Sequence, residues 1–506
     1  AAGAPPRMLD ALVQTPQRFS TVRKAGASTL YSVGLPAGGG GAGDSYATPP
    51  LVAVLRGTRH QIGHAYAALL HAETSQSADA FLTATFAKEW EQALIRRFVD
   101  YCWTHFLEPR TPRAFRDELA GMRAWYTDTA AGRHAQQTDA HRADAVAAMF
   151  YTLANMPADP QNIVAMLEQE LEQGWPWWLK EAVNEIVALL GRLVHSCDAF
   201  GVWGARTSPA RALYASRNLD YNSNTGINKH KLVVVFDVHN DTSVRGGAYA
   251  AMGFTVGLGA LAGMSMAGVS TSEMNLDNSR VTFDGVPFPL RLRMVLERAT
   301  DVRSALDVWA ATNNTNSFNF LIGAAADAAV AGADAAVALE TVRGFTQVYA
   351  ADSAVERDAT YDCTHDPSCH KWTNATGVVH IGAPLADAVW RSNHALSPTI
   401  MRTQEPLFNN TVFRYNLMHD LFDGLARAGV AVNATVAVRV AATLGIKGAN
   451  YLTCHQELRG DNVMSIAYAN TARRFYIAWE SYGGAAWRPA ACSPYVALDL
   501  AALANM

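Results

Sequence analysis

The spacing of apolar residues predicts helices through much of the first part of the chain. Between about residues 59 and 193, apolar residues recur three and four positions apart, which places them on one face of a helix. The pattern is clearest in HQIGHAYAALLHAE, FAKEWEQALIRRFVDYCWTHF and QNIVAMLEQELEQ. Residues 1–50 lack this pattern and end in the run GLPAGGGGAGDSYATPP, so we expect them to be irregular.

Near His195 the pattern changes to short runs rich in β-branched and aromatic residues, which predict strands. These runs are LYASRNLDY, KLVVVFDVH, FNFLIGAA and RRFYIAWE. Helical spacing returns in FPLRLRMVLERA, VRSALDVWAAT and TVFRYNLMHDLFDGLARAG. The change of pattern predicts two pieces of one globule, a mostly helical part over residues 1–196 and a strand-rich part over 197–506.

Two apolar segments allow more than one interpretation. Residues 247–272 carry no charge and are long enough for a membrane helix, but their many glycines favour a pair of buried strands with glycine turns. We therefore expect no transmembrane segment. The alanine-rich stretch 324–340 could form a helix, yet the strand before it and the break at Gly332 favour a strand–turn–strand.

The composition is that of a globular protein, because half of the 506 residues are hydrophobic and 17% are charged. A net charge of −4 without a Lys/Arg cluster argues against nucleic acid as a partner. The start AAGAPPRMLD has no initiator Met and looks like a mature terminus after processing. Together with N-x-S/T sequons, this favours the secretory pathway, with a lysosomal or extracellular destination. The candidate glycosylation sites are Asn240, Asn313, Asn374, Asn409 and Asn433.

An oxidising compartment would favour pairing of the six cysteines. Cys363 and Cys369 bracket a short loop that suits a local disulfide, and Cys454 could pair with Cys492. The segment CTHDPSCH could instead bind zinc, but its ligands are crowded into eight residues, so the disulfide is favoured and no metal is expected.

Cys197 is the candidate nucleophile. A cysteine thiol needs a base before it can attack an acyl carbon. Cleavage of the Ser196–Cys197 peptide bond would place a free α-amine beside this thiol, and an α-amine titrates near roughly 7.7–8.0 and can act as that base. On the next predicted strand, Arg217 could hold the thiolate and Asp220 the ammonium.

Cys197 followed by Arg217-Asn218-Leu219-Asp220-Tyr221 resembles the opening of the choloylglycine-hydrolase-like superfamily. The match is best with its acyl-CoA:isopenicillin-N acyltransferase-like branch; other members include bile salt hydrolases, acid ceramidase and N-acylethanolamine amidase, with phospholipase-B-like proteins more distant. Further motifs follow in the same order: GALAGMSMAGVSTSEMNL, NSFNFLIGAA, WRSNHALSP and NTVFRYNLMHDLF. A departure is Ser265, where the branch commonly has Asn.

The resemblance implies roles for residues in these later motifs. Asn275 and Asn393 correspond to donors that hold the oxyanion, and Asn319 and Arg414 are weaker candidates. It implies an α+β fold, a four-layer α/β/β/α N-terminal-nucleophile sandwich with a helical N-terminal subunit that stays bound after cleavage and shields the site before it.

The implied activity is that of a self-processing enzyme that needs no cofactor and cleaves linear amides of small acylated compounds, possibly lipids, through an acyl-enzyme on Cys197. Within enzymes, the alternatives are an acyltransferase or a phospholipase-B-like lipid hydrolase. A catalytically inactive lipid-binding or structural relative is the alternative from another class.

Overall fold

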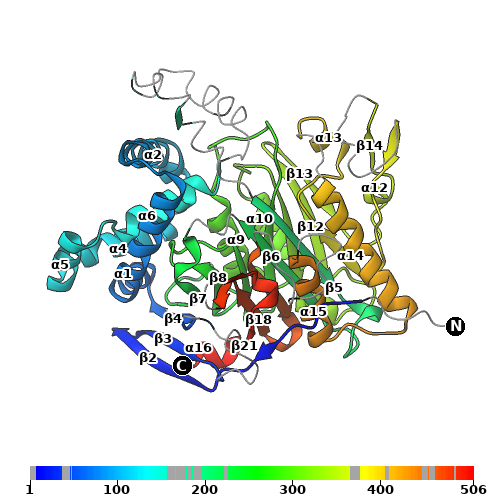
Figure 1. The fold of residues 1–506 in the computed structure, drawn as a ribbon, viewed down its shortest axis with the longest axis horizontal. Helices are drawn as coiled ribbons and strands as arrows, with labels where there is room; N and C mark the ends of the chain where they lie inside the picture. Colours follow the sequence, from blue (N-terminus) through cyan, green and yellow to red (C-terminus); the bar gives the residue numbers. More distant parts are fainter. Residues whose placement is uncertain are drawn as a thin grey trace.

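Two large β-sheets and the helices that cover them make up this mixed α/β fold (Figure 1). The structure is a computed structural model. It describes residues 7–36, 46, 48–156, 166, 178, 182, 185–186, 195–221, 226–364, 377–404, 409–446, 454, 462–483 and 486–506.

The described strands form one seven-stranded and one ten-stranded sheet. The first sheet has, in spatial order, β1 (Val13–Gln14), β21 (Tyr495–Asp499), β18 (Arg474–Trp479), β17 (Asn462–Ala469), β6 (Tyr214–Tyr221), β5 (His195–Val202) and β16 (Ala388–Arg391). The second has β13 (Phe345–Tyr349), β12 (Ala336–Val342), β11 (Phe318–Ala324), β10 (Val269–Asn275), β9 (Ala262–Ser265), β8 (Tyr249–Phe254), β7 (Lys231–Val238), β4 (Leu51–Gly57), β3 (Ser28–Gly34) and β2 (Arg18–Ala25). Two small ribbons pair β14 (Thr360–Asp362) with β15 (Val378–His380) and β19 (Ser481–Gly483) with β20 (Ala486–Arg488).

The helices before residue 196 gather on one side of the sheets in Figure 1, and α14 lies on the opposite side. The first group is α1 (Arg59–Thr85), α2 (Glu89–Cys102), α3 (Glu108–Arg110), α4 (Arg113–Asp128), α5 (Ala130–Thr138) and α6 (Ala143–Leu153). The later helices are α9 (Phe288–Arg298), α10 (Val302–Ala310), α11 (Ala325–Ala328), α12 (Ala354–Arg357), α13 (Pro398–Met401), α14 (Asn409–Arg427), α15 (Ala434–Gly445) and α16 (Leu500–Ala504).

The sheets meet through β5 and β6 of the first sheet, which contact β10 of the second. On the outer side of the second sheet, α9 contacts β8, β9 and β10. On the outer side of the first, α15 contacts β6 and β17. The strands at this centre are therefore covered on both faces, which explains why all residues of β6 and β10 are buried.

Most elements expected from the sequence are present. All four expected strand runs form strands (β6, β7, β11 and β18), and the segment 247–272 contains β8, β9 and most of β10 rather than a helix. The alanine-rich stretch is the expected strand–turn–strand, because β11 pairs antiparallel with β12, with α11 inside the connection. The expected helix QNIVAMLEQELEQ lies almost entirely outside the described residues.

The expectation that residues 1–50 are irregular is wrong. β2 and β3 form an antiparallel hairpin whose turn contains Gly26, with a positive φ of 59°. β2 is the outermost strand of its sheet and is largely exposed on both faces, so its sequence lacks the alternation of apolar and polar residues that marks a half-buried strand.

The described residues of the N-terminal part contribute strands to both sheets. β4 pairs in parallel with β7 along its whole length, from Leu51 opposite Leu232 to Gly57 opposite Val238. β1 pairs in parallel with β21 in the other sheet. The N-terminal part is thus joined to the rest by backbone hydrogen bonds in addition to helix packing.

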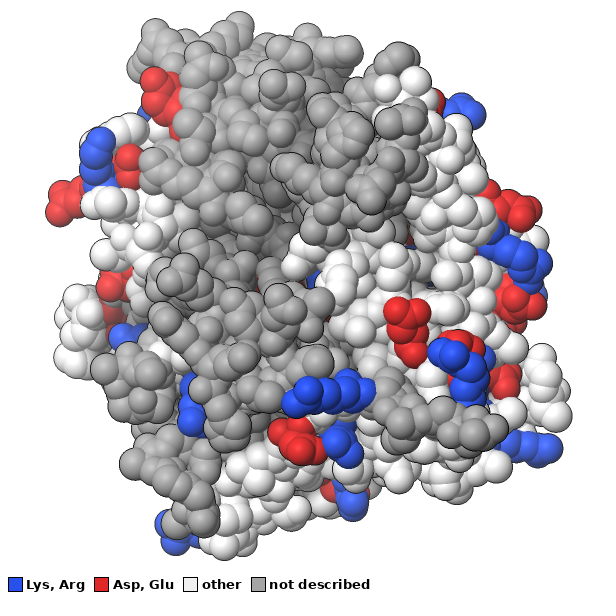
Figure 2. Space-filling view, turned by 45° about the vertical axis from the view of Figure 1, so that its right-hand side comes forward, with Lys and Arg blue, Asp and Glu red and all other residues white. Residues whose placement is uncertain are grey.

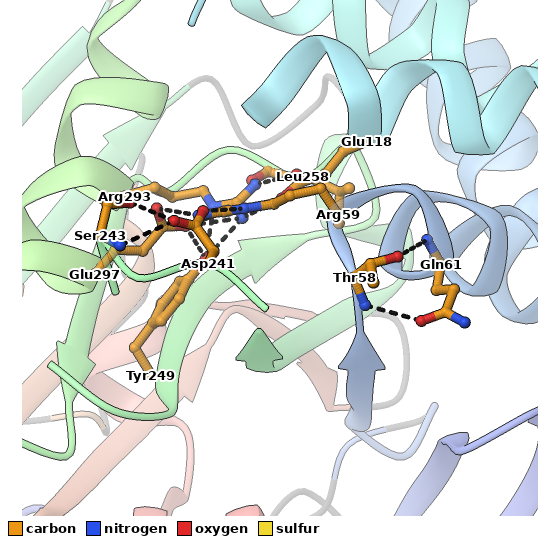
Figure 3. Close-up of polar contacts among 10 residues, drawn as sticks. All are labelled: Thr58, Arg59, Gln61, Glu118, Asp241, Ser243, Tyr249, Leu258, Arg293 and Glu297. Carbon is orange, nitrogen blue, oxygen red and sulfur yellow. Dashed lines mark hydrogen bonds and ion pairs between the residues drawn. The ribbon is translucent and has the colours of Figure 1, made fainter. Parts of the chain in front are cut away.

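A buried ionic cluster also joins the two parts (Figure 3). Arg59, the first residue of α1, donates to Glu118 of α4, to Glu297 of α9 and to Asp241 at 2.8–3.1 Å. Arg293 of α9 donates to the same Glu118 and Glu297 at 2.6–3.2 Å. Each carboxylate and guanidinium of this cluster therefore has an opposite charge, which is the condition under which charges tolerate burial.

The structure confirms one of the two expected disulfides. Cys454 and Cys492 form a disulfide with a Cα–Cα distance of 5.6 Å. Cys363 is also disulfide-bonded, while Cys369, its expected partner, lies outside the described residues. Cys102 and Cys197 are buried thiols outside disulfides.

The surface carries charges of both signs. Figure 2 shows Lys and Arg side chains interspersed with Asp and Glu on the described part of one face. Among the described helices, none combines the length and the hydropathy that a membrane span requires.

Candidate active site

Cys197 lies near the start of β5, opposite Leu219 of the neighbouring strand β6. Cys197 is 1% exposed, and it lines a cavity of about 100 Å³. The Ser196–Cys197 peptide bond belongs to the same strand, with Ser196 opposite Asp220. The β5–β6 pairing therefore brings the candidate scissile bond, the candidate nucleophile and the Arg217–Asp220 motif together.

The surroundings of Cys197 favour a protonated thiol. Burial raises the pKa of this thiol to about 12, although the Arg217 guanidinium and the backbone N–H of Asp220 act in the opposite direction. The thiolate is thus not formed in advance, and a base must remove the proton before the sulfur can attack.

Arg217 is fully buried and is held from two sides. It donates through Nη2 to Glu273 Oε1 at 2.5 Å and through Nη1 to the carbonyl of Asn218. Asp220, on the same strand, accepts a hydrogen bond from Asn462 Nδ2 at 3.0 Å. Arg217 is thus held by β10 of the facing sheet, and Asp220 by the adjacent strand β17.

Asn393 connects the parts of the site. Its Oδ1 accepts the backbone N–H of Cys197 at 2.6 Å and Arg414 Nη2 at 2.8 Å. Its Nδ2 donates to the backbone carbonyl of Asn275 at 2.8 Å. The nitrogen that would become the α-amine after cleavage is therefore held by Asn393, whereas the sequence interpretation gave the ammonium to Asp220.

Arg414, a weaker candidate in the sequence, is in direct contact with the site. From α14 it donates to the backbone carbonyl of Cys197 and to Asp198 Oδ2 at 3.2 Å. Asp198 is fully buried, and burial raises the pKa of its carboxyl while Arg414 lowers it. The side chains of Arg414 and Asn393 together fix the backbone on both sides of Cys197.

Of the candidates Asn275 and Asn319, Asn275 lines the cavity and Asn319 does not. Asn275 ends β10 and borders the cavity, and its Nδ2 donates to Asp277 Oδ1 at 3.1 Å. Asn319, on β11, is not among the residues that line this cavity. Its Nδ2 donates instead to the backbone carbonyls of Ser392 and His394, the two neighbours of Asn393.

The cavity is apolar except at the Cys197 end. Its wall combines residues from α1 and α6 with residues from the strand-rich part. The lining residues are Ala78, Phe81, Val146, Met149, Phe150, Leu153, Ala154, Met156, Cys197, Leu219, Tyr221, Phe254, Val256, Leu261, Glu273, Asn275, Phe288 and Phe318. The N-terminal helices thus supply one side of the space that a substrate of Cys197 would enter.

Glu273 is a site residue that the sequence interpretation missed. It lies two positions before Asn275 on β10, so both side chains point to the same face. Burial raises the pKa of its carboxyl, and the ion pair with Arg217 opposes this rise. The sequence feature that could have identified Glu273 is that it is the single carboxylate in the otherwise uncharged strand VSTSEMN.

The chain matches no protein-family model and no curated protein sequence. It does match solved structures. A Caenorhabditis elegans ortholog of N-acylethanolamine-hydrolyzing acid amidase aligns with a TM-score of 0.33 and 13% identity, covering 54% of this chain and 93% of that one. A mutant conjugated bile acid hydrolase from Clostridium perfringens gives 0.35 and 13%, covering 60% and 94%. Penicillin V acylase from Agrobacterium tumefaciens gives 0.27 and 10%, covering 56% and 83%.

The chain is similar to these hydrolases and acylases. The roles of individual residues in this chain rest on the geometry described above.

Proposed function

We propose that this chain is a self-processing cysteine N-terminal-nucleophile hydrolase that cleaves amides of N-acyl compounds. One observation carries the proposal: the thiol of Cys197 borders an apolar cavity while the backbone nitrogen of the same residue is held by Asn393 Oδ1 at 2.6 Å. After cleavage of the Ser196–Cys197 bond, the same residue would supply the attacking sulfur and the base.

The reaction begins when the α-amine of Cys197 takes the proton of the thiol. The sulfur attacks the acyl carbon, and the side-chain amides of Asn275 and Asn393 donate to the resulting oxyanion. The C–N bond breaks as the α-amine returns the proton to the leaving nitrogen, which leaves a thioester. Water, deprotonated by the same α-amine, then releases the acid and regenerates the thiol.

The lining of the cavity supports an apolar acyl group as the part of the substrate that is buried. Transfer of each methylene from water to such a cavity contributes about 0.8 kcal/mol. Glu273, which accepts a hydrogen bond from Arg217, lines the cavity together with Cys197. This arrangement favours N-acyl lipids over compounds with polar acyl groups.

We also propose that fragment 1–196 remains bound as a subunit after cleavage, in a four-layer α/β/β/α arrangement. The pairing of β4 with β7 supports this, as do the ionic cluster of Figure 3 and the contribution of α1 and α6 to the cavity. The disulfide, together with the exposed sequon residues Asn240, Asn313 and Asn433, supports the secretory pathway.

Denaturing mass spectrometry and a hydrolysis assay test the proposal together. The native protein should separate into fragments 1–196 and 197–506, and the second should begin with Cys197. Cys197→Ala should remain one chain and hydrolyse no fluorogenic N-acyl amide. Cys102→Ala is the matched control, because Cys102 is also a buried thiol but is not among the residues that line the cavity, and this variant should be cleaved and active.

The same assay separates the alternatives. A wild-type chain that stays intact and hydrolyses no amide of any acyl length would contradict the proposal and favour a non-enzymatic relative. An added acceptor amine separates hydrolysis from acyl transfer, because a transferase would form the new amide in preference to the free acid.

A further inference from the structure

The backbone on both sides of Asn393 is held by buried polar side chains from three separate elements. Asn319 Nδ2 donates to the carbonyl of Ser392 at 2.9 Å and to that of His394 at 3.0 Å. Glu340 accepts the backbone N–H groups of Leu396 and Ser397 at 2.8–3.0 Å. This loop is therefore fixed by hydrogen bonds from β11 and β12.

The third contact is to Asn393 itself. Its backbone N–H donates to the hydroxyl of Thr411 at 2.8 Å, and Thr411 is 3% exposed. Thr411 and Arg414 are three residues apart on α14, so they lie on one side of the helix. Thr411 holds the backbone of Asn393 while Arg414 holds its side-chain oxygen.

The neighbours of Thr411 leave its hydroxyl oxygen able to accept this bond. Its own proton is donated to Ser392 Oγ at 2.9 Å, and His394 Nδ1 lies 3.0 Å away. Burial, with the charges of Arg391 and Arg414, lowers the pKa of His394 to about 3, so its ring is neutral. A hydroxyl oxygen has two acceptor lone pairs, so that of Thr411 can accept from Asn393 whichever ring nitrogen of His394 carries the proton. The hydroxyl is thus oriented to accept from Asn393.

We infer that Thr411 is a positioning residue that sets the orientation of Asn393 toward the Cys197 nitrogen, with Asn319 holding the same loop from the opposite side. The inference rests on the proposed function, since it concerns the nitrogen that would become the catalytic amine. Thr411 itself touches neither the cavity nor Cys197 among the contacts described.

The inference predicts an effect on the base as well as on the rate. A hydrogen bond from the ammonium of Cys197 to Asn393 Oδ1 favours the charged form and raises the pKa of the amine. If Asn393 loses its position, that pKa falls. The acidic limb of the pH profile of kcat/KM should then move to lower pH, which a simple loss of folded protein would not cause.

Thr411→Val is the test variant, because valine keeps the shape and removes the hydroxyl. We expect kcat per cleaved enzyme to fall about 10- to 100-fold with KM changed less than about twofold. Thr411→Ser restores the hydroxyl and should return kcat to within about threefold of wild type. Thr411 is also the third residue of the Asn409 sequon, so Asn409→Gln controls for loss of a glycan and should keep wild-type kcat.

Thr443→Val controls for destabilisation. Thr443 is 1% exposed and its hydroxyl accepts the backbone N–H of Leu9 at 2.9 Å, so the variant loses the same kind of bond at a distance from Asn393. It should lower the melting temperature without shifting the pH profile. A folded Thr411→Val protein that stays uncleaved while Thr443→Val is cleaved would also support the inference, since cleavage uses the same Cys197–Asn393 contact.

The inference is overturned if Thr411→Val loses no more kcat than Thr443→Val, or if its pH profile keeps the wild-type position. Should Thr411→Val fail to fold, Asn319→Leu replaces it, with the same expected loss of kcat and the same shift; wild-type kcat in that variant overturns the inference. Wild-type protein that is uncleaved and inactive means instead that the proposed function is wrong and that this inference fails with it. An active wild type with unaffected variants contradicts only the role of Thr411.

Discussion

Replacing Arg293 with methionine would test how strongly the ionic cluster joins the two parts of the chain. Arg293 is fully buried and donates to two carboxylates, Glu118 from the N-terminal part and Glu297 from the C-terminal part (Figure 3). Its guanidinium also donates to the hydroxyl of Tyr249 and to the carbonyl of Leu258. Methionine fills a similar space but removes the charge and every one of these bonds.

The expected loss in the free energy of unfolding follows from the burial of these charges. Without Arg293, Glu118 and Glu297 keep Arg59 but share one guanidinium in place of two, and breaking a buried ion pair typically costs about 3–5 kcal/mol. This corresponds to a factor of roughly 100 to several thousand in the unfolding equilibrium. The exposed pair Arg303–Asp307 gives the comparison, since its side chains are 87% and 69% exposed and such pairs contribute about 0–1 kcal/mol.

Urea unfolding followed by tryptophan fluorescence measures the difference. Arg293→Met should unfold at clearly lower urea than wild type, and Arg303→Met should unfold close to wild type. The double variant Arg293→Met/Glu118→Leu should be more stable than Arg293→Met alone, because it also removes a carboxylate that has lost a partner. Equal midpoints for Arg293→Met and Arg303→Met would refute the view that this cluster stabilises the joined parts.

Three further outcomes can be measured. Leu153→Trp should narrow the cavity, and kcat/KM should fall most for the longest N-acyl chains in a series of substrates; an equal loss at all lengths would contradict the assignment of this wall to the acyl group. Glu273 has a pKa raised by burial above its usual 4.5, so it contributes stability below about pH 4 that is lost as the pH rises through the raised pKa. Glu273→Gln should therefore flatten the fall of melting temperature from pH 4 toward neutrality, and an unchanged slope would count against this. Cys492→Ser opens a disulfide that joins residues 38 positions apart and should lower the free energy of unfolding by about 2–4 kcal/mol in denaturant titrations, whereas no change would show that Cys454 and Cys492 are unpaired in solution.

Local patterns predicted much of the strand-rich part. The LVVVF run of β7 is uniformly apolar because both faces of this strand are covered, and a short run of β-branched and aromatic residues predicts a strand without knowledge of its neighbours. The hairpin of β2 and β3 was missed for the opposite reason. β2 is the exposed edge of the sheet, so Arg18, Arg23 and Lys24 could replace apolar residues there, and the local signal was lost.

Part of the candidate site could likewise be predicted from local sequence and part could not. Cys197, Arg217 and Asp220 lie on adjacent strands joined by a short connection, so their spacing in sequence already suggested their proximity. Cys197 and Asn393 are in contact although they are 196 positions apart in the sequence. The periodicity of a helix or strand predicts only contacts between residues close in sequence, so it could not predict this one. Glu273 was visible only as a charge in a buried strand, and its partner Arg217 is 56 positions away on another sheet.

The sequence by itself therefore predicted the candidate nucleophile, the candidate cleavage site and the order of strands and helices around them, because these depend on residues close together along the chain. Only the tertiary structure decided which group holds the Cys197 nitrogen, which helices line the cavity and which strands of the N-terminal part join each sheet. Those features depend on which faces and edges meet when the sheets pack, and packing is settled by the whole chain together.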